Sequence, residues 1–113
     1  MAIGATAEQK TVFVFVKIPE SVSPVERGRK YEDPLDKVLR VAKLGEVTGG
    51  GSQLGPDGRV SWVGVDVELF DVETGIPFVK QALLKLGAPK DTTLTYETAG
   101  RRVDVAIGSA QQR

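Results

Sequence analysis

The segment from Gly45 to Phe70 constrains the fold of this 113-residue chain more than any other part. It contains a glycine-rich run, the turn sequence Gly-Pro-Asp-Gly at 55–58, and a stretch from 63 to 69 in which every second residue is Val or Leu. Alternation with a period of two is typical of a strand with one buried face, and Pro, Asp and Gly favour a tight turn. The segment therefore predicts a β-hairpin.

Strand and helix patterns follow one another along the rest of the chain. Period-two runs of β-branched and aromatic residues predict strands, whereas apolar residues three and four apart behind a capping residue predict helices. One long stretch has no sustained periodicity, and we expect it to be a loop. The expected elements are a strand at Thr11–Ile18, the loop at Pro19–Glu32, a helix capped by Asp33 and ended by Gly45, the hairpin, a helix capped by Asp71 or Thr74 and ended by Gly87, and strands at Thr92–Glu97 and Arg101–Ile107.

This order, β-α-β-β-α-β with a trailing strand, predicts an α+β fold. Right-handed crossovers favour the ferredoxin-like (split βαβ) topology, an antiparallel sheet with spatial strand order 4, 1, 3, 2 and both helices on one face. A doubly wound parallel sheet would need more βα units than the chain has. We expect a single domain over residues 11–108, with flexible ends at 1–10 and 109–113.

Composition excludes several kinds of function. Fifteen Lys and Arg balance fifteen Asp and Glu, so no overall field attracts nucleic acid or an anionic membrane. Histidine and cysteine are absent, which removes Ser-His and thiol chemistry, disulfides and the usual zinc ligands. We therefore predict no metal and no cofactor, and the composition argues against an enzyme without deciding the question. The longest apolar run, Val12–Val16, is too short to span a membrane and no leader pattern precedes it, so we expect a cytoplasmic protein.

Three aromatic residues fall on the sheet face that the helices would leave open: Phe13 and Phe15 on the first strand and Trp62 on the third. Aromatic rings surrounded by polar residues are typical of protein interface anchors. RNA-recognition modules also stack bases on such a face, but Asp66 and Glu68 place negative charge beside the rings. A protein partner is therefore favoured over nucleic acid. The alternative is that the trailing strand or the terminal segments cover the rings.

A run of three glycines, Gly49, Gly50 and Gly51, lies in the predicted second strand at an edge of the sheet. Glycine leaves backbone N–H and C=O groups unshielded, so a partner strand, a second copy or a small ligand can approach closely. The alternative is a bulge that only lets the edge twist. No helix follows the run and no phosphate-loop pattern is present, which argues against a phosphate site.

Five basic residues gather at one end of the predicted sheet, from the long loop, the hairpin turn and the connection after the second helix. Acidic residues accompany them in the sequence. They predict either a site for an anion or acidic partner, or a solvated rim of mixed charge, and the rim is favoured. The five residues are Arg27, Arg29, Lys30, Arg59 and Lys90.

Three short motifs carry a family resemblance. They are YEDPL at 31–35, GEVTGGG at 45–51 and GAP at 87–89. Over Tyr31–Glu97 the chain resembles a small bacterial family of single-domain proteins of uncharacterised function. The resemblance implies a stand-alone domain and carries over no site residues.

The sequence as a whole predicts a non-enzymatic cytoplasmic protein-binding domain, an immunity or regulatory factor. Its partner is another protein or a second copy in a homodimer, held by the sheet face or the glycine-rich edge. The alternative is a small-ligand or weakly enzymatic module. In that alternative the glycine-rich strand, Tyr31, Arg27 and Glu46 or Glu68 line a pocket.

Overall fold

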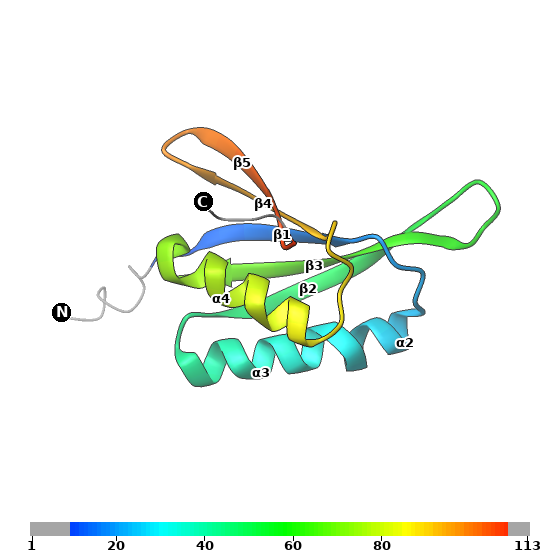
Figure 1. Ribbon diagram of the computed structural model, residues 1–113, viewed down its shortest axis with the longest axis horizontal. Coiled ribbons are helices and arrows are strands. Elements are labelled where there is room, and N and C mark those ends of the chain that lie inside the picture. The colour runs from blue at the N-terminus through cyan, green and yellow to red at the C-terminus, as the bar shows by residue number, and fades with distance from the viewer. Residues whose placement is uncertain (1–9, 109–113) are drawn as a thin grey trace.

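Five antiparallel strands form one sheet in the computed structural model, which describes residues 10–108 (Figure 1). The predicted flexible ends, apart from Lys10, lie outside these described residues. The strand order is β2-β3-β1-β4-β5, so β2 and β5 form the two edges. The strands are β1 Val12–Ile18, β2 Gly45–Leu54, β3 Val60–Leu69, β4 Thr93–Thr98 and β5 Arg101–Ala106.

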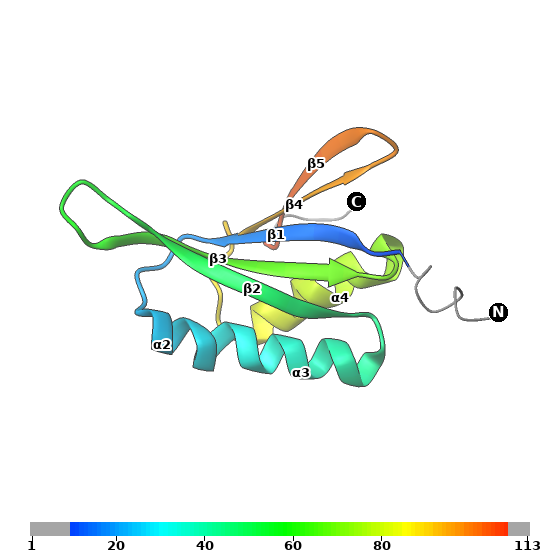
Figure 2. The same cartoon turned by 180° about the vertical axis from the view of Figure 1, so that it is seen from behind.

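Two longer helices, α3 and α4, lie on the same side of this sheet, as Figures 1 and 2 show from opposite directions. The α+β class and the antiparallel sheet are confirmed, but a further helical stretch before α3 goes beyond the predicted elements. Within residues 10–108, no helix has the length and apolar character needed to cross a membrane. The helical elements are α2 Pro24–Arg27, the π-helix η1 Gly28–Glu32, α3 Asp33–Ala42 and α4 Val72–Lys85.

The prediction of a loop over Pro19–Glu32 is wrong in its second half, because the helical stretch begins at Pro24. The Ser23 hydroxyl caps it by accepting a hydrogen bond from the Glu26 N–H at 3.1 Å. Asp33, the predicted cap, lies inside the continuous run of α2, η1 and α3. Ser followed three residues later by Glu has the spacing of a capping box, which was the available signal in the sequence. Without a buried residue in α2, no apolar period marked the helix.

Pro34 explains why this run contains the π-helical turn η1. Proline has no N–H, and in a regular α-helix its ring would clash with the carbonyl four residues earlier. The backbone widens instead, and the Asp33 N–H bonds to the Gly28 carbonyl five residues back. A π turn of this kind relieves a local conflict without ending the helix.

The helix α3 does not end at Gly45 as predicted. Lys43 takes the left-handed conformation, with φ 60°, and its N–H and that of Leu44 close the last turn on Arg40 and Leu39. Gly45 already belongs to β2, where an added Cβ would overlap the Glu68 carbonyl oxygen. A glycine is therefore required at position 45 so that β2 can pack closely against β3. The end of α4 follows the prediction, with Gly87 at φ 87°.

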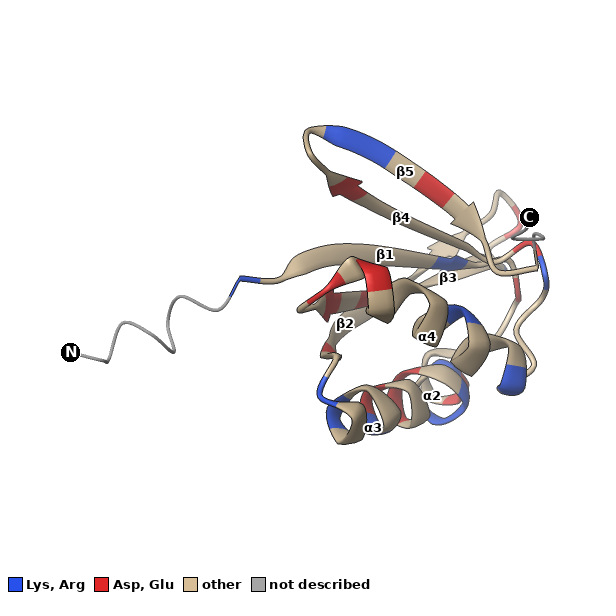
Figure 3. Ribbon diagram, turned by 60° about the vertical axis from the view of Figure 1, so that its left-hand side comes forward, with Lys and Arg blue, Asp and Glu red and all other residues tan. Residues whose placement is uncertain are grey.

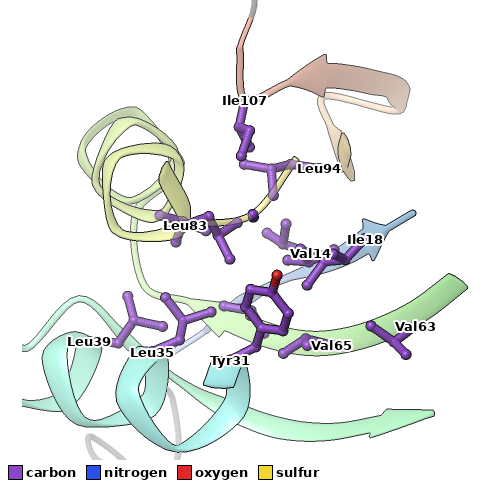
Figure 4. Close-up of a cluster of buried hydrophobic side chains, with 14 of the residues drawn as sticks. Val14, Ile18, Tyr31, Leu35, Leu39, Val63, Val65, Leu83, Leu94 and Ile107 are labelled. Atoms are coloured by element: carbon purple, nitrogen blue, oxygen red, sulfur yellow. The ribbon is translucent and has the colours of Figure 1, made fainter. Parts of the chain in front are cut away.

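The hydrophobic core fills the space between the sheet and the two long helices (Figure 4). Alternate residues of β1 and β3 point into it, and α3 and α4 supply leucines from the other side. Tyr31 of η1 is fully buried among them. The largest buried side chains include Val14, Ile18, Tyr31, Leu35, Leu39, Val65, Leu69, Leu83, Leu94 and Ile107.

Candidate functional site

The three predicted aromatic residues share the sheet face opposite the helices. Phe13 is 48% exposed, while Phe15 and Trp62 are half-buried. The rings of Phe15 and Trp62 meet edge to face, with centroids 5.9 Å apart and planes at 83°. The Lys17 ammonium lies 4.8 Å from the centre of the Trp62 ring, within the range of a cation–π contact. The structure thus brings these side chains together as one aromatic cluster: Phe13, Phe15, Lys17 and Trp62.

Gly64 is a part of this cluster that sequence reasoning missed. A Cβ at Gly64 would lie 2.7 Å from the Phe15 ring and 3.6 Å from that of Trp62. The glycine therefore leaves room for the Phe15 ring against the β3 backbone. A glycine interrupting an otherwise regular strand was the available signal, since it often marks close approach by a neighbour.

An open groove of about 950 Å³ runs along this face beside the aromatic cluster. The β4–β5 hairpin bends out of the plane of the other strands, as Figures 1 and 3 show, and residues of both its strands line the groove. The part of the predicted alternative in which the trailing strand covers the rings is wrong, because β5 pairs beside β4 at the sheet edge. The terminal segments named in the same alternative lie outside the described residues. The lining includes Phe13, Phe15, Trp62, Thr95, Arg102 and Asp104.

Fixed acidic groups accompany the rings. The Glu68 carboxylate accepts a hydrogen bond from the Thr11 hydroxyl at 2.6 Å. The Thr95 hydroxyl donates to Asp104 at 2.6 Å, and this bond lowers the pKa of Asp104 against the opposing effect of desolvation, with a further contribution from Arg102. Both hydrogen bonds position a carboxyl group on the open face. The groove therefore presents an apolar centre with a charged rim.

The glycine-rich strand β2 lies at a sheet edge, as predicted. The register shifts between Val47 and Gly49, which is the bulge of the alternative interpretation. The three glycines then differ in their surroundings. At Gly50, an added Cβ would overlap the Glu32 carboxylate, and at Gly49 it would lie 3.1 Å from the Asp66 carboxylate, whereas Gly51 has no described neighbour within 4 Å. The close approach at Gly50 is made by the chain's own side chain.

Other side chains of the helical stretch also bind β2. The Asp36 carboxylate accepts the Val47 backbone N–H at 2.9 Å. Arg40 bridges Asp36 and Glu46, at 2.9 and 2.8 Å. Farther along, the Arg27 guanidinium donates to the Ser52 hydroxyl at 2.9 Å. The helical stretch therefore contacts this edge at Val47, Gly50 and Ser52, while residues 50–54 themselves stay exposed.

The five predicted anion-patch residues do not share one environment. Arg27 pairs with Glu32 at 2.5 Å and Lys30 with Glu20 at 2.9 Å, and both cations are largely shielded. Arg59 lies 4.0 Å from Asp57 on the hairpin turn and is highly exposed. Arg29 is exposed beside Lys30, and Lys90 is exposed near Gly108. This distribution favours a rim of mixed charge, and the anion site stays a prediction.

A polar cluster formed by Tyr31, Glu20 and Lys30 was not foreseen. The Tyr31 hydroxyl donates a hydrogen bond to Glu20, and the Lys30 ammonium lies 5.1 Å from the centre of the Tyr31 ring. Burial, reinforced by that hydrogen bond, raises the pKa of Tyr31 to about 12. Desolvation opposes ionisation of Glu20, but the hydrogen bonds from Tyr31 and Lys30 outweigh it and lower its pKa. These contacts hold η1 against the segment that follows β1.

The pocket of the alternative function is not assembled from the residues predicted for it. Tyr31 is fully buried, and Arg27 is engaged by Glu32 and Ser52. Glu46 pairs with Arg40, while Glu68 bonds to Thr11 on the open face of the sheet. Among the described residues, no group of three or more acidic side chains is arranged to hold a metal ion.

Comparison with known proteins found no family model, no curated protein and no solved structure that matches this chain. The resemblance to a bacterial family noted from the three motifs therefore stays a prediction, and the residues of the open face carry the functional argument.

Proposed function

We propose that this chain is a non-enzymatic binding domain that holds a partner protein on the open face of its sheet. The observation that carries the proposal is the aromatic cluster, which is set on paired strands and left uncovered by the helices. Large aromatic side chains at the centre of a concave surface, with a polar rim, are typical of binding hot spots.

The rim favours protein over nucleic acid as the partner. Asp66 is registered directly opposite Phe15, and Asp104 lies across from Thr95 on the same face. These carboxylates would repel a phosphate backbone, whereas Lys17 and Arg102 add the opposite sign. A protein surface carries side chains of both signs and suits such a rim.

An immunity or regulatory role follows naturally from this kind of binding. Such a factor acts by occupying its partner and needs no nucleophile, and the chain has neither histidine nor cysteine. The genes beside the coding sequence provide a simple test. A neighbouring toxin gene would support the immunity role, whereas a metabolic operon would favour the small-ligand alternative.

Partner capture from the source cells tests the binding face directly. Phe13→Ala and Trp62→Ala should each weaken retention by about 30-fold or more, as expected for hot-spot residues worth about 2 kcal/mol. Val41→Ala is the matched control, because Val41 is a 76% exposed apolar residue of α3, away from the groove. Trp62 is the single tryptophan, so a purified partner should also change the fluorescence of the wild-type protein.

Equal retention by both aromatic variants, with melting curves like that of the wild type, would show that the face is not the binding surface. The small-ligand alternative has a separate test in thermal-shift screening against nucleotides, sugars and acidic metabolites. A ligand at 100 times its dissociation constant should stabilise the fold by about 2.7 kcal/mol.

We also propose that the architecture is ferredoxin-like. Without β5, the observed order reads β4-β1-β3-β2, which is the order of a split βαβ sheet. In this interpretation β5 and the helical stretch of α2 and η1 are additions to the plain arrangement.

A further inference from the structure

We propose that two copies of this chain associate through the outer edge of β5, which places five strands from each copy in one continuous sheet. A twofold axis would pass through Val103, with the two β5 strands antiparallel. The outer edge of β5 lies beyond the aromatic cluster, although Arg102 and Asp104 also line the groove, and the inference does not depend on the proposed function.

The backbone of β5 has groups directed away from β4. The Ile107 N–H bonds to the Thr92 carbonyl at 2.9 Å, and this pair continues the register that joins Leu94 to Val105. Hydrogen-bonded and non-hydrogen-bonded pairs alternate along an antiparallel ladder. The backbone groups of Val103 and Val105 therefore point toward β4, and those of Arg102 and Asp104 point outward.

Only some registers allow two such edges to pair. A residue whose backbone groups point outward must pair with a residue of the same kind in the second copy. Such residues alternate along β5, so the twofold axis has to pass through a residue and not between two residues. An axis at Arg102 or at Asp104 would place that residue opposite its own copy, with like charges adjacent. An axis at Val103 places Arg102 of each copy opposite Asp104 of the other. This register matches both the backbone groups and the charges.

The side chains are exposed enough to make these cross-strand pairs, which would replace or share their contact with each other. Arg102 and Asp104 retain side-chain exposures of 70% and 53%, and within the single chain their nitrogen and oxygen atoms are 3.3 Å apart. Thr95 holds the Asp104 carboxylate on the open face by its 2.6 Å hydrogen bond. On the opposite face, Val103 would meet its own copy in a non-hydrogen-bonded pair, in which side chains come close together.

Charged residues on an edge strand usually prevent strand addition, because an incoming strand leaves them unpaired or opposite like charge. The sequence Arg102-Val103-Asp104 escapes this restriction, because reversing it about Val103 exchanges the two signs. Figure 3 shows the basic and acidic segments in succession along β5. The charges thus oppose addition of an arbitrary strand and favour addition of a second β5.

Charge exchange tests this arrangement. We expect Arg102→Asp and Asp104→Arg each to place like charges opposite each other and weaken the dimer about tenfold or more in sedimentation equilibrium. The double variant R102D/D104R restores opposite charges and should recover the wild-type dissociation constant. An equimolar mixture of the two single variants should form a heterodimer, since one edge is then acidic and the other basic.

Far-UV circular dichroism and melting curves serve as the folding control for each variant. The proposal is wrong if the wild type stays monomeric up to ~1 mM, a concentration that corresponds to about −4.1 kcal/mol of association. It is also wrong if the single variants dimerise as well as the wild type, or if the double variant and the mixture stay as weak as the singles. Phe13→Ala should leave the dimer unchanged, and loss of the dimer in that variant would assign it to the open face instead.

Discussion

The two edge strands of the sheet are protected in different ways. The longer edge, β2, has the run of glycines, yet Asp36 binds its backbone at Val47 and Glu32 lies against Gly50. On the shorter edge, β5, the exposed side chains of Arg102 and Asp104 carry opposite charges. Glycine content alone therefore does not identify an accessible edge. What matters is whether side chains from neighbouring elements already occupy it.

The largest expected effect tests the view that β2 needs glycine for packing. Gly45→Ala should destabilise the fold by about 3 kcal/mol or more, because its Cβ would overlap the Glu68 carbonyl and the backbone must move. Gly51→Ala is the matched control and should change stability by less than about 0.5 kcal/mol, since no described atom lies within 4 Å of the added Cβ. Urea unfolding measures both. Similar losses at the two positions would contradict the difference described within β2.

The segment that covers β2 depends on Tyr31. Tyr31→Phe removes the hydrogen bond to Glu20 and should cost about 1–2 kcal/mol at neutral pH. The pKa of Tyr31 is raised from 10.0 to about 12, first by burial and then by that hydrogen bond. The neutral phenol therefore stabilises the fold fully below pH 10, and this contribution is lost as the pH rises toward 12.

Unfolding free energies between pH 9 and 12 should consequently fall more steeply for the wild type than for Tyr31→Phe. Tyr96→Phe leaves Tyr31 as the only tyrosine, so its ultraviolet absorbance reports the titration directly. An ordinary tyrosine titration in the folded Tyr96→Phe protein would refute the buried phenol. At low pH the relevant group is Glu20, because folding lowers its pKa below the ordinary value of 4.5. The stability that its carboxylate contributes is therefore present above pH 4.5 and is lost as the pH falls further.

A smaller effect is expected where α3 covers the β2 edge. Asp36→Ala leaves the Val47 N–H without its acceptor and should cost about 1 kcal/mol. Asp36→Asn keeps an oxygen at the same place and should lose less. Hydrogen exchange at the Val47 amide gives the local measurement, and it should be faster in the alanine variant. Unchanged exchange there would mean that Asp36 does not protect this edge.

The sequence predicted what local chemistry determines. The period of two marked β3, and Gly87 marked the end of α4, because strand faces and helix caps depend on nearby residues. The helical stretch from Pro24 was missed, since a four-residue helix without a buried side chain has no apolar period. The pairing of Tyr31 with Glu20, and the place of Glu32 against Gly50, depend on how η1 packs on the sheet. No pattern within a single segment encodes those contacts.

The open face also combines features that local sequence determines with features that depend on packing between elements. Alternation placed Phe13, Phe15 and Trp62 on one side of the sheet, and the structure confirms that placement. The groove beside them could not be predicted, because it arises from the bend of the β4–β5 hairpin out of the sheet. The role of Gly64 was also hidden, since its neighbours come from both its own strand and β1.

The space that Gly64 leaves for the Phe15 ring has a consequence for any molecule that docks on this face. The Phe15 ring is confined there, with Trp62 against its edge, before a partner arrives. Fixing a freely rotating side chain on association costs about 0.5–1.5 kcal/mol, and a ring already held in place avoids most of that cost. A preorganised ring of this kind favours slow dissociation, so a complex on this face should be long-lived for the area it buries.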